Sequence, residues 1–311
     1  MVKIDLITGF LGAGKTSFLK KYAQYLMNQG NRICILENDY GAVNVDMLLL
    51  NELRGEQCEL EMVAGGCDYD CHKRRFKTKL ISMGMCGYDR VLVEPSGIFD
   101  VDEFFDVLYE EPLDRWYEIG NVIAVVDSGL ENKLSKQSEY LLASQVAGAG
   151  SIVLSKTQNA SDEQIKNVIA HMNQALKQVQ CKRQVESEVN TKDWNSYTEA
   201  DWKNISECGY VHENYVKLAL EQDNEYASLY YMNIQMPEDE LRNKMEKIMQ
   251  DEKCGHIFRI KGFMKLDDDQ WLEMNVTHDQ IDIHRADKGQ EVFIIIGEEL
   301  VEAEIDKYWK E

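Results

Sequence analysis

The stretch Gly9–Thr16 has the residue types and spacing of a phosphate-binding loop. Its sequence, G-F-L-G-A-G-K-T, matches the P-loop pattern G-x-x-x-x-G-K-[ST]. Glycines let the backbone curl so that several N–H groups point at phosphate oxygens, and a following helix adds partial positive charge. We expect Lys15 to reach the β- and γ-phosphates and the Thr16 hydroxyl to ligate Mg²⁺. The predicted nucleotide-binding residues of this loop are Gly9, Gly12, Ala13, Gly14, Lys15, Thr16 and Ser17.

A second carboxylate near Mg²⁺ is supplied by the stretch R-V-L-V-E-P-S-G, residues 90–97. Glu94 stands at the end of a buried-strand pattern and is expected to hold the metal directly or through water. The N–H of Gly97 is placed to sense a γ-phosphate. The alternative is a solvated glutamate at an ordinary strand end.

Asn38–Gly41 follows another apolar run, so it is expected at the same edge of the sheet. The Asp39 carboxylate could there reach Mg²⁺ or orient water, which adds Asp39 to Lys15 and Glu94 as a candidate catalytic residue. An ordinary polar turn is an equally good interpretation of this segment.

A weak guanine-recognition signal follows a later strand, at S-K-T-Q, residues 155–158. Many GTPases have Asn-Lys-x-Asp there, with the Asp accepting hydrogen bonds from guanine and the Lys stem packing along the ring. Lys156 is kept, whereas Gln158 can still accept one bond but carries no charge. Lys156 and Gln158 are therefore predicted to contact the base.

Two thiols and an imidazole lie within six residues, at Cys67, Cys71 and His72. Such soft and borderline ligands suit Zn²⁺ or a neighbouring transition metal. The alternative is one thiol buried as a small hydrophobe, with the other thiol and His72 exposed in a loop.

Short apolar runs alternate with helical patterns in the first part of the chain. Candidate strands are 2–7, 33–36, 89–94, 122–127 and 151–155, and candidate helices include 17–27, 101–109, 138–147 and 161–178. Nearly all-apolar strands separated by helices predict an α/β fold: a doubly wound, mostly parallel sheet of the P-loop NTPase type. Its ligand should lie at the carboxyl ends of the strands.

The alternation of apolar strands and helical patterns is lost between about Cys181 and Cys208, and a different hydrophobic periodicity starts near Tyr226. Candidate strands there are 229–234, 256–263, 271–276, 280–284 and 291–296, with helices at 238–249 and about 298–309. Several of these strands alternate apolar with polar residues, as antiparallel strands with one wet face do. We therefore expect a P-loop domain over 1–205 and a small α+β domain over 206–311.

Composition limits the classes of partner. The 311 residues have a formal net charge of −21, which argues against nucleic acid and anionic membrane. No apolar run approaches the ~18 residues of a membrane span, and because the first predicted strand begins at residue 2, we expect no signal peptide. The eight cysteines are then expected to be reduced thiols of a cytoplasmic protein.

Taken together, these motifs resemble the CobW/HypB/UreG family, and in particular its CobW-like branch. The segments that carry the resemblance are Ile7–Thr16, Asn38–Gly41 with Asp46, Gly65–Cys67, Glu94–Gly97, Arg259–Phe263 and Val292–Gly297. They fall in order along nearly the whole chain. Two positions depart from the branch: Tyr69 and Asp70 stand where Cys-x-Cys-Cys has adjacent cysteines, and the guanine signal is altered as described above.

The resemblance implies a GTPase whose hydrolysis drives metal delivery, metal insertion or maturation of a metal-containing cofactor. It implies Mg²⁺ and GTP or GDP as ligands, Zn²⁺ or Co²⁺ as the associated ion, cobalamin as an associated cofactor, and a metal- or corrinoid-dependent client protein. A second interpretation is a nucleotide-gated binding module with slow hydrolysis and no metal cargo, in which the nucleotide sets the conformation of residues 58–79. A P-loop phosphotransferase fits less well, because no basic lid is evident.

The Gln158 position generates a first prediction. GTP should bind more tightly than ATP, but less selectively than in GTPases with an Asp, and Gln158→Asp should raise the preference because it restores a charged acceptor for guanine. Calorimetric competition between GTP and ATP measures both. Equal affinities in the wild type, or tighter ATP, would contradict the assignment of this segment.

Overall fold

The computed structural model describes residues 1–39, 46–65, 69–217, 226–266, 270–278 and 280–310. The chain divides into two compact units, Met1–Leu220 and Glu221–Glu311. The boundary expected between residues 205 and 206 stays a prediction. Part of the segment after it belongs to the first unit: Gly209 N donates to Asn121 Oδ1 at 2.8 Å, and Val216 N to Val179 O at 2.8 Å.

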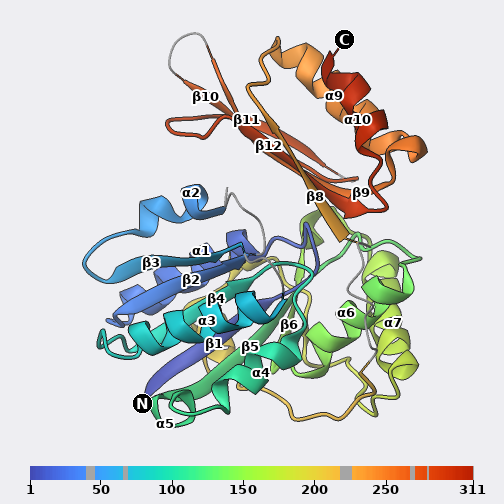
Figure 1. Ribbon diagram of the computed structural model, residues 1–311. Coiled ribbons are helices and arrows are strands. Elements are labelled where there is room, and N and C mark those ends of the chain that lie inside the picture. The colour runs from blue at the N-terminus through green and yellow to red at the C-terminus, as the bar shows by residue number, and fades with distance from the viewer. Residues whose placement is uncertain (40–45, 66–68, 218–225, 267–269, 279, 311) are drawn as a thin grey trace. The chain divides into compact units, whose positions relative to one another are not determined.

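The first unit is built on a seven-stranded parallel sheet (Figure 1). Its strands are β1 (Val2–Thr8), β2 (Ile33–Asp39), β3 (Cys58–Ala64), β4 (Arg90–Pro95), β5 (Tyr117–Asp127), β6 (Ser151–Ser155) and β7 (Val189–Asn190), in the order β3-β2-β4-β1-β5-β6-β7. Every residue of β4 and β6 is buried, as the apolar runs there predicted. The predicted α/β class and doubly wound parallel sheet are confirmed.

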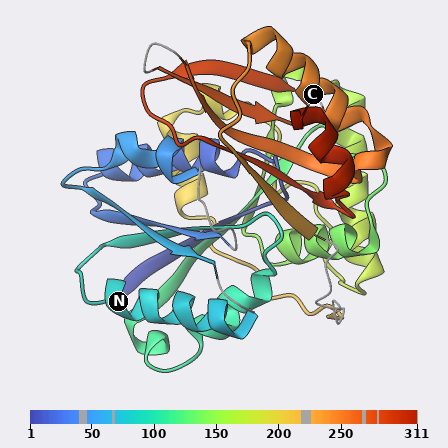
Figure 2. The ribbon, with the colours of Figure 1, turned by 45° about the horizontal axis from the view of Figure 1, so that its top comes forward.

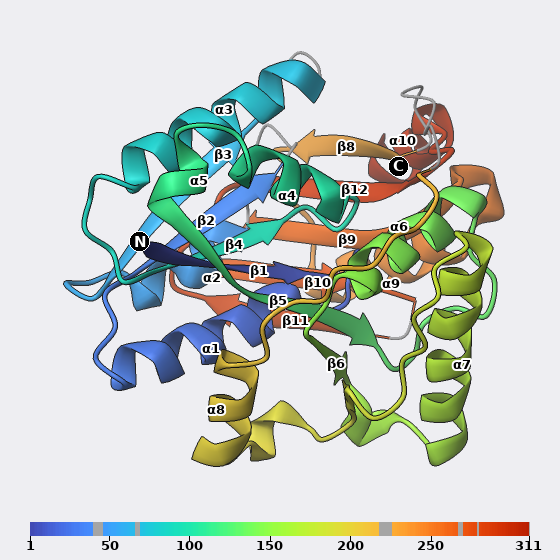
Figure 3. The same ribbon diagram turned by 90° about the horizontal axis from the view of Figure 1, so that it is seen from below.

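Helices cover both faces of this sheet. They are α1 (Lys15–Asn28), α2 (Asp46–Leu50), α3 (Tyr69–Met83), α4 (Val101–Leu108), α5 (Leu113–Trp116), α6 (Lys136–Ala147), α7 (Asp162–Gln178) and α8 (Glu199–Ser206), with the short 3₁₀ turns η1 (Asn51–Leu53), η2 (Thr157–Asn159) and η3 (Trp194–Ser196). Figure 3 shows α1 and α8 on one face and α3, α4 and α5 on the other. Parallel strands need such crossovers, which is why the sheet is shielded on both sides.

Helix α1 buries one apolar stripe against the sheet. Phe18, Leu19, Tyr22, Ala23 and Leu26 are all buried, at spacings that place them on one side of a 3.6-residue helix. This stripe joins side chains from β1, β2, β4, β5 and β6 in one core. The helix therefore follows directly from the periodicity of the sequence.

The segment 181–208, where the sequence pattern fades, is packed on α1. The rings of Trp194 and Trp202 lie 5.5 and 5.6 Å from the ring of Phe18, and α8 begins with a capping box between Thr198 and Asp201. The tryptophans thus add to the core of the first unit.

A buried polar network crosses the centre of the sheet. Asp5 of β1 accepts from Arg90 of β4 at 2.8 Å, from Tyr22 of α1 at 2.7 Å and from the backbone N–H of Asn121 of β5 at 2.9 Å. Burial raises the pKa of Asp5, against the opposing attraction of the Arg90 guanidinium. Burial is the largest single influence on the pKa of Arg90 and lowers it, but the charges and hydrogen bonds of Asp5 and Tyr22 together outweigh burial, so that the pKa of the guanidinium is raised. The pair holds β1, β4, β5 and α1 together.

The second unit is a five-stranded antiparallel sheet with two helices. The elements are β8 (Tyr226–Met232), α9 (Glu238–Gln250), η4 (Glu252–Cys254), β9 (His256–Lys265), β10 (Trp271–Val276), β11 (Ile281–Ala286), β12 (Val292–Glu298) and α10 (Glu302–Lys310), and the sheet order is β11-β10-β9-β12-β8. Figure 2 shows α9 in orange and α10 in dark red beside this sheet. Their side chains Leu241, Met245 and Ile305 share one core with Ile257 and Ile295 of the sheet. This confirms the predicted α+β domain.

The last helix begins later than the sequence pattern indicates. The prediction placed its start near Glu298, whereas Glu298 ends β12 and α10 starts at Glu302. Glu298 is paired with Tyr226 of β8 and His256 of β9, so strand pairing decides its conformation. Among the described residues, no helix is both long and apolar enough to cross a membrane.

The buried network generates the second prediction. Arg90→Ala should lower the free energy of unfolding by about 3–5 kcal/mol, because it leaves Asp5 buried without its cation. The control, Arg115→Ala, removes an arginine that is 71% exposed and pairs with Glu111, and should cost less than about 1 kcal/mol. Urea denaturation of both variants measures the difference. Similar losses would show that the buried pair is no stronger a constraint than a surface one.

Candidate nucleotide and metal site

The phosphate-binding loop lies between β1 and α1, at the carboxyl edge of the sheet. Gly14 has a φ of +90°, a left-handed conformation that glycine adopts without strain, and α1 begins at the next residue. The loop is closed by Ala13 N donating to Phe10 O at 3.2 Å. Gly9, Gly12, Ala13, Gly14, Lys15, Thr16 and Ser17 therefore all stand in a strand–loop–helix unit. The first turn of α1 presents its backbone N–H groups at this point, where an anion is stabilised.

Lys15 and Thr16 occupy the first two positions of α1. The Lys15 ammonium lies over the loop, 3.4 Å from the Phe10 carbonyl oxygen, and the side chain is only 7% exposed. The Thr16 hydroxyl donates to Glu94 Oε1 at 2.7 Å, and both side chains are buried. The structure thus brings together a cation, a hydroxyl and a carboxylate that the sequence places almost eighty residues apart.

The turn after Glu94 is held against the loop. A Cβ at Gly97 would lie 2.6 Å from the backbone nitrogen of Leu11, so only glycine allows this approach. Gln145 of α6 donates to Gly97 O at 3.0 Å, and Ser96 N donates to Asn38 O at 2.9 Å. The loop, the Glu94 turn and the end of β2 therefore meet at one edge.

The end of β2 carries a carboxylate that the sequence analysis overlooked. Glu37 stands directly opposite Glu94 in the parallel pair β2–β4, and their exposures are 3% and 4%. A buried acidic residue near the end of an otherwise apolar strand was the available signal. Asp39 is the last residue of β2, and its side chain lies outside the described part of the structure.

These donors fit a hard divalent cation. A threonine hydroxyl and a glutamate carboxylate in direct contact, with a second carboxylate on the adjacent strand, are the oxygen ligands that Mg²⁺ takes. Thr16 and Glu94 are the residues that would hold it. Their roles, and those of Lys15, Asp39 and Gly97, stay predictions.

The base-recognition segment follows β6. The Lys156 ammonium pairs with Asp127, the last residue of β5, at 2.5 Å, while Gln158 is exposed in η2. Trp194 reaches the same place: a Cβ on Gly14 would lie 3.4 Å from the edge of its indole and 3.7 Å from Ser155 Cβ. Trp194 was not among the residues predicted from the sequence, because its proximity to the loop depends on tertiary packing.

The structure describes only part of the segment that carries Cys67, Cys71 and His72. Cys67 lies outside the described residues, and Cys71 and His72 are neighbours in the first turns of α3. His72 is fully buried, not exposed in a loop, and its Nδ1 lies 3.1 Å from Gly65 O. In the neutral ring Nδ1 then carries the proton, which directs the Nε2 lone pair away from that carbonyl. The metal site of Cys67, Cys71 and His72 stays a prediction.

Four other thiols are poor metal ligands. Burial raises the pKa of Cys34 and of Cys208 to about 12, and that of Cys58 and of Cys254 to about 11. A metal binds the thiolate, which is scarce at neutral pH when the pKa is this high. Cys34, Cys58 and Cys254 are buried, and Cys208 is partly buried against the core of the first unit.

The fold and the loop define a P-loop nucleotide-binding protein with a separate α+β domain. The family model "CobW/HypB/UreG, nucleotide-binding domain" matches residues 3–186, and "Cobalamin synthesis protein cobW C-terminal domain" matches residues 233–311. The chain belongs to the CobW/HypB/UreG family. This confirms the resemblance drawn from the motifs.

Curated relatives match part of the chain. It is 28% identical over 183 residues to the zinc chaperone YjiA of Escherichia coli (strain K12), which covers 55% of this chain and 55% of that one. It is 27% identical over 175 residues to the zinc-regulated GTPase metalloprotein activator 1 of Schizosaccharomyces pombe, covering 54% of this chain and 42% of that one. The chain thus spans about half the length of the curated relatives it matches.

One of the solved structures that match the chain is the Zn(II)-bound YjiA GTPase from E. coli. It is 18% identical, with coverage of 99% of this chain and 98% of that chain, and the TM-score is 0.38. At this score it adds nothing to the family assignment.

The position of Trp194 generates the third prediction. If its indole stacks on the bound base, Trp194→Ala should weaken GTP binding by about 1–3 kcal/mol, whereas Trp194→Phe should keep most of the affinity. Nucleotide should change the fluorescence of the wild type and of the control Trp202→Phe, but not of Trp194→Phe. Thermal melting separates a loss of contact from a loss of fold. If nucleotide changes the fluorescence of Trp194→Phe as much as that of the wild type, the Trp194 indole does not contact the nucleotide.

Proposed function

We propose that this protein is an Mg²⁺-dependent GTPase that couples nucleotide hydrolysis to the transfer of a Zn²⁺-class ion to a client protein. The observation that carries the proposal is the 2.7 Å contact between Thr16 and Glu94 beside a complete phosphate-binding loop. Membership of the CobW/HypB/UreG family supports the reaction class.

The residues of the loop have distinct roles in this proposal. The loop amides and Lys15 stabilise the negative charge that moves onto the leaving phosphate oxygens. Thr16 and Glu94 would hold Mg²⁺, which supplies charge neutralisation between the β- and γ-phosphates. Asp39, at the end of β2, orients the attacking water. The Gly97 N–H couples the γ-phosphate to the turn after Glu94.

Guanine preference is supported by the Lys156 segment. The ion pair with Asp127 fixes the Lys156 stem at the end of β6, and Trp194 supplies an aromatic surface close to Gly14 and Ser155. Gln158 accepts a hydrogen bond from the base. The pocket would thus combine shape and stacking with one neutral polar contact.

Zinc is the favoured cargo because two observations point to it. Cys67, Cys71 and His72 are ligands that suit Zn²⁺, and relatives bear the names zinc chaperone and zinc-regulated GTPase metalloprotein activator. Two thiolates and one imidazole leave a fourth position open, to which Asp68 or Asp70 could add a weaker oxygen ligand, and this suits an ion that must be released. Cobalt delivery, or maturation of a corrinoid enzyme, is the alternative that the name of the second family model suggests.

The fourth prediction tests GTP hydrolysis first and the coupling of the nucleotide to the metal second. Lys15→Ala should lower GTP turnover by at least about 100-fold, since it removes the charged side chain of the cradle. The control Lys20→Ala removes a lysine of the same helix that pairs with Glu52 and should turn over normally. Phosphate release measures both.

Zinc content is then measured in the nucleotide-free, GDP and GTP-analogue forms. The wild type should hold an ion whose affinity differs between these forms. Cys67→Ser with Cys71→Ser should lose it, whereas Cys86→Ser, which changes an exposed thiol, should keep it. Equal zinc in the wild type and the double variant would contradict the carrier proposal. Slow turnover with no bound ion would favour the nucleotide-gated binding module.

A further inference from the structure

A β-bulge in β9 changes which side chains share a face in the second unit. The register with β12 shifts between Ile296, opposite Arg259, and Gly297, opposite Ile257, so Phe258 is the extra residue. Ile257 and Ile260 both belong to the core with α9 and α10. Phe258 and Arg259 must therefore both lie on the other face of the sheet, and His256 lies there too, by alternation from Ile257.

His256 has two neighbours with metal-binding side chains. Glu298 is directly opposite it on β12, and His256 Nδ1 lies 3.8 Å from Glu298 Oε2. His278 follows β10, where Thr277 N donates to Gln280 O at 2.8 Å and closes the turn into β11. The two imidazole rings have centroids 5.9 Å apart, and one nitrogen of each lies within 4.8 Å of the other.

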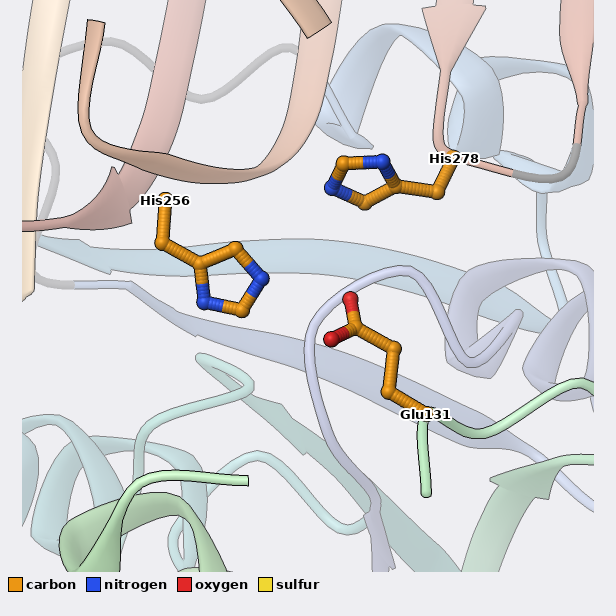
Figure 4. A group of neighbouring side chains, drawn as sticks. All are labelled: Glu131, His256 and His278. Carbon is orange, nitrogen blue, oxygen red and sulfur yellow. The ribbon is translucent and has the colours of Figure 1, made fainter. Parts of the chain in front are cut away.

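Figure 4 shows a ring nitrogen of each histidine on the side that faces the other. Glu131, which Figure 4 also labels, belongs to the first unit and is not part of this pair. Two nitrogens bound tetrahedrally to one Zn²⁺ at about 2.0–2.1 Å lie about 3.4 Å apart. A side-chain rotation that brings the two nitrogens closer by at most about 1.4 Å is therefore enough for both to bind the same ion.

We propose that His256 and His278 form a second divalent-metal site on the C-terminal domain, which Glu298, whose Oε2 lies 3.8 Å from His256 Nδ1, completes by a side-chain rotation. Two neutral imidazoles and one carboxylate are ligands for Zn²⁺ and for the neighbouring ions Co²⁺ and Ni²⁺. The site contains no thiolate, and its residues belong to one sheet: His256 is on β9, Glu298 on β12, and His278 in the turn between β10 and β11. It is therefore separate in sequence and in chemistry from the cysteine segment of the first unit.

The competing explanation is ordinary packing. The His256 ring lies 4.5 Å from the ring of Phe258, and a charged His256 would attract Glu298 without any metal. Packing alone predicts no change in metal stoichiometry when both histidines are replaced. The metal site predicts the loss of one ion.

The fifth prediction uses the full chain with Zn²⁺ alone as the probe. The parent is the Cys67→Ser, Cys71→Ser variant, so that a thiol site cannot contribute. Calorimetry should show that this parent still binds one Zn²⁺. Adding His256→Ala with His278→Ala should abolish that binding, and adding His278→Ala alone should lower the affinity for Zn²⁺ by more than about tenfold. The control is His284→Ala, an exposed histidine of the same sheet that pairs with Glu273 at 3.1 Å, and it should bind as the parent does.

A second measurement reports the ligands. Co²⁺ bound by the parent should give d–d absorption without the intense thiolate charge-transfer band, and the spectrum should disappear in the double histidine variant. His256→Gln with His278→Gln keeps polar side chains of similar size, which makes a loss of the ion through misfolding less of a concern than in the alanine variants. Zinc binding that survives both double variants, or that is lost equally in His284→Ala, would overturn the site. Neither result depends on GTP turnover, so the proposed function can fail while this site stands.

Discussion

The buried ion pair between Asp5 and Arg90 is the constraint on which the first unit depends. Both charges are removed from water, so each is tolerated only with its partner and with Tyr22 and Asn121 to share the remaining hydrogen bonds. The pair sits across β1 and β4 and fixes which strand lies beside the first. All strands of a parallel sheet run in the same direction, so the neighbour of β1 also determines which carboxylate lies beside the phosphate-binding loop. That carboxylate is Glu94, four residues after Arg90 on β4, and it accepts the hydrogen bond from Thr16.

Much of the fold could be predicted because several strands are almost entirely apolar. Strands β4, β5 and β6 are apolar runs, and α7 starts with a Ser161–Gln164 capping box. Strand β3 was not predicted, since Cys58–Ala64 alternates glutamates with apolar residues at the edge of an otherwise buried sheet. The start of α10 was misplaced because local spacing does not report that Glu298 is already paired in a strand.

Some residues of the candidate sites could likewise be predicted from the sequence, and others could not. Gly9–Thr16 and Glu94–Gly97 could be found from the sequence, since phosphate binding demands a fixed local spacing. Trp194 could not be assigned, because it reaches Gly14 only through packing on Phe18. The histidines of the second unit are 22 positions apart, and a bulge in the strand puts them within reach. No periodicity reports such an extra residue, because it breaks the alternation on which sequence patterns rest.

Deep burial of most of the other cysteines has a consequence for the traffic of soft metal ions. Eight thiols in one chain would form a sink that competes with any dedicated ligand set and traps ions at random. Burial raises the pKa of Cys34 and Cys208 to about 12 and that of Cys58 and Cys254 to about 11, so that little metal-binding thiolate forms at these four residues near neutral pH. If the protein carries a metal ion as proposed, burial in the hydrophobic core thus limits which sulfur atoms that ion can reach.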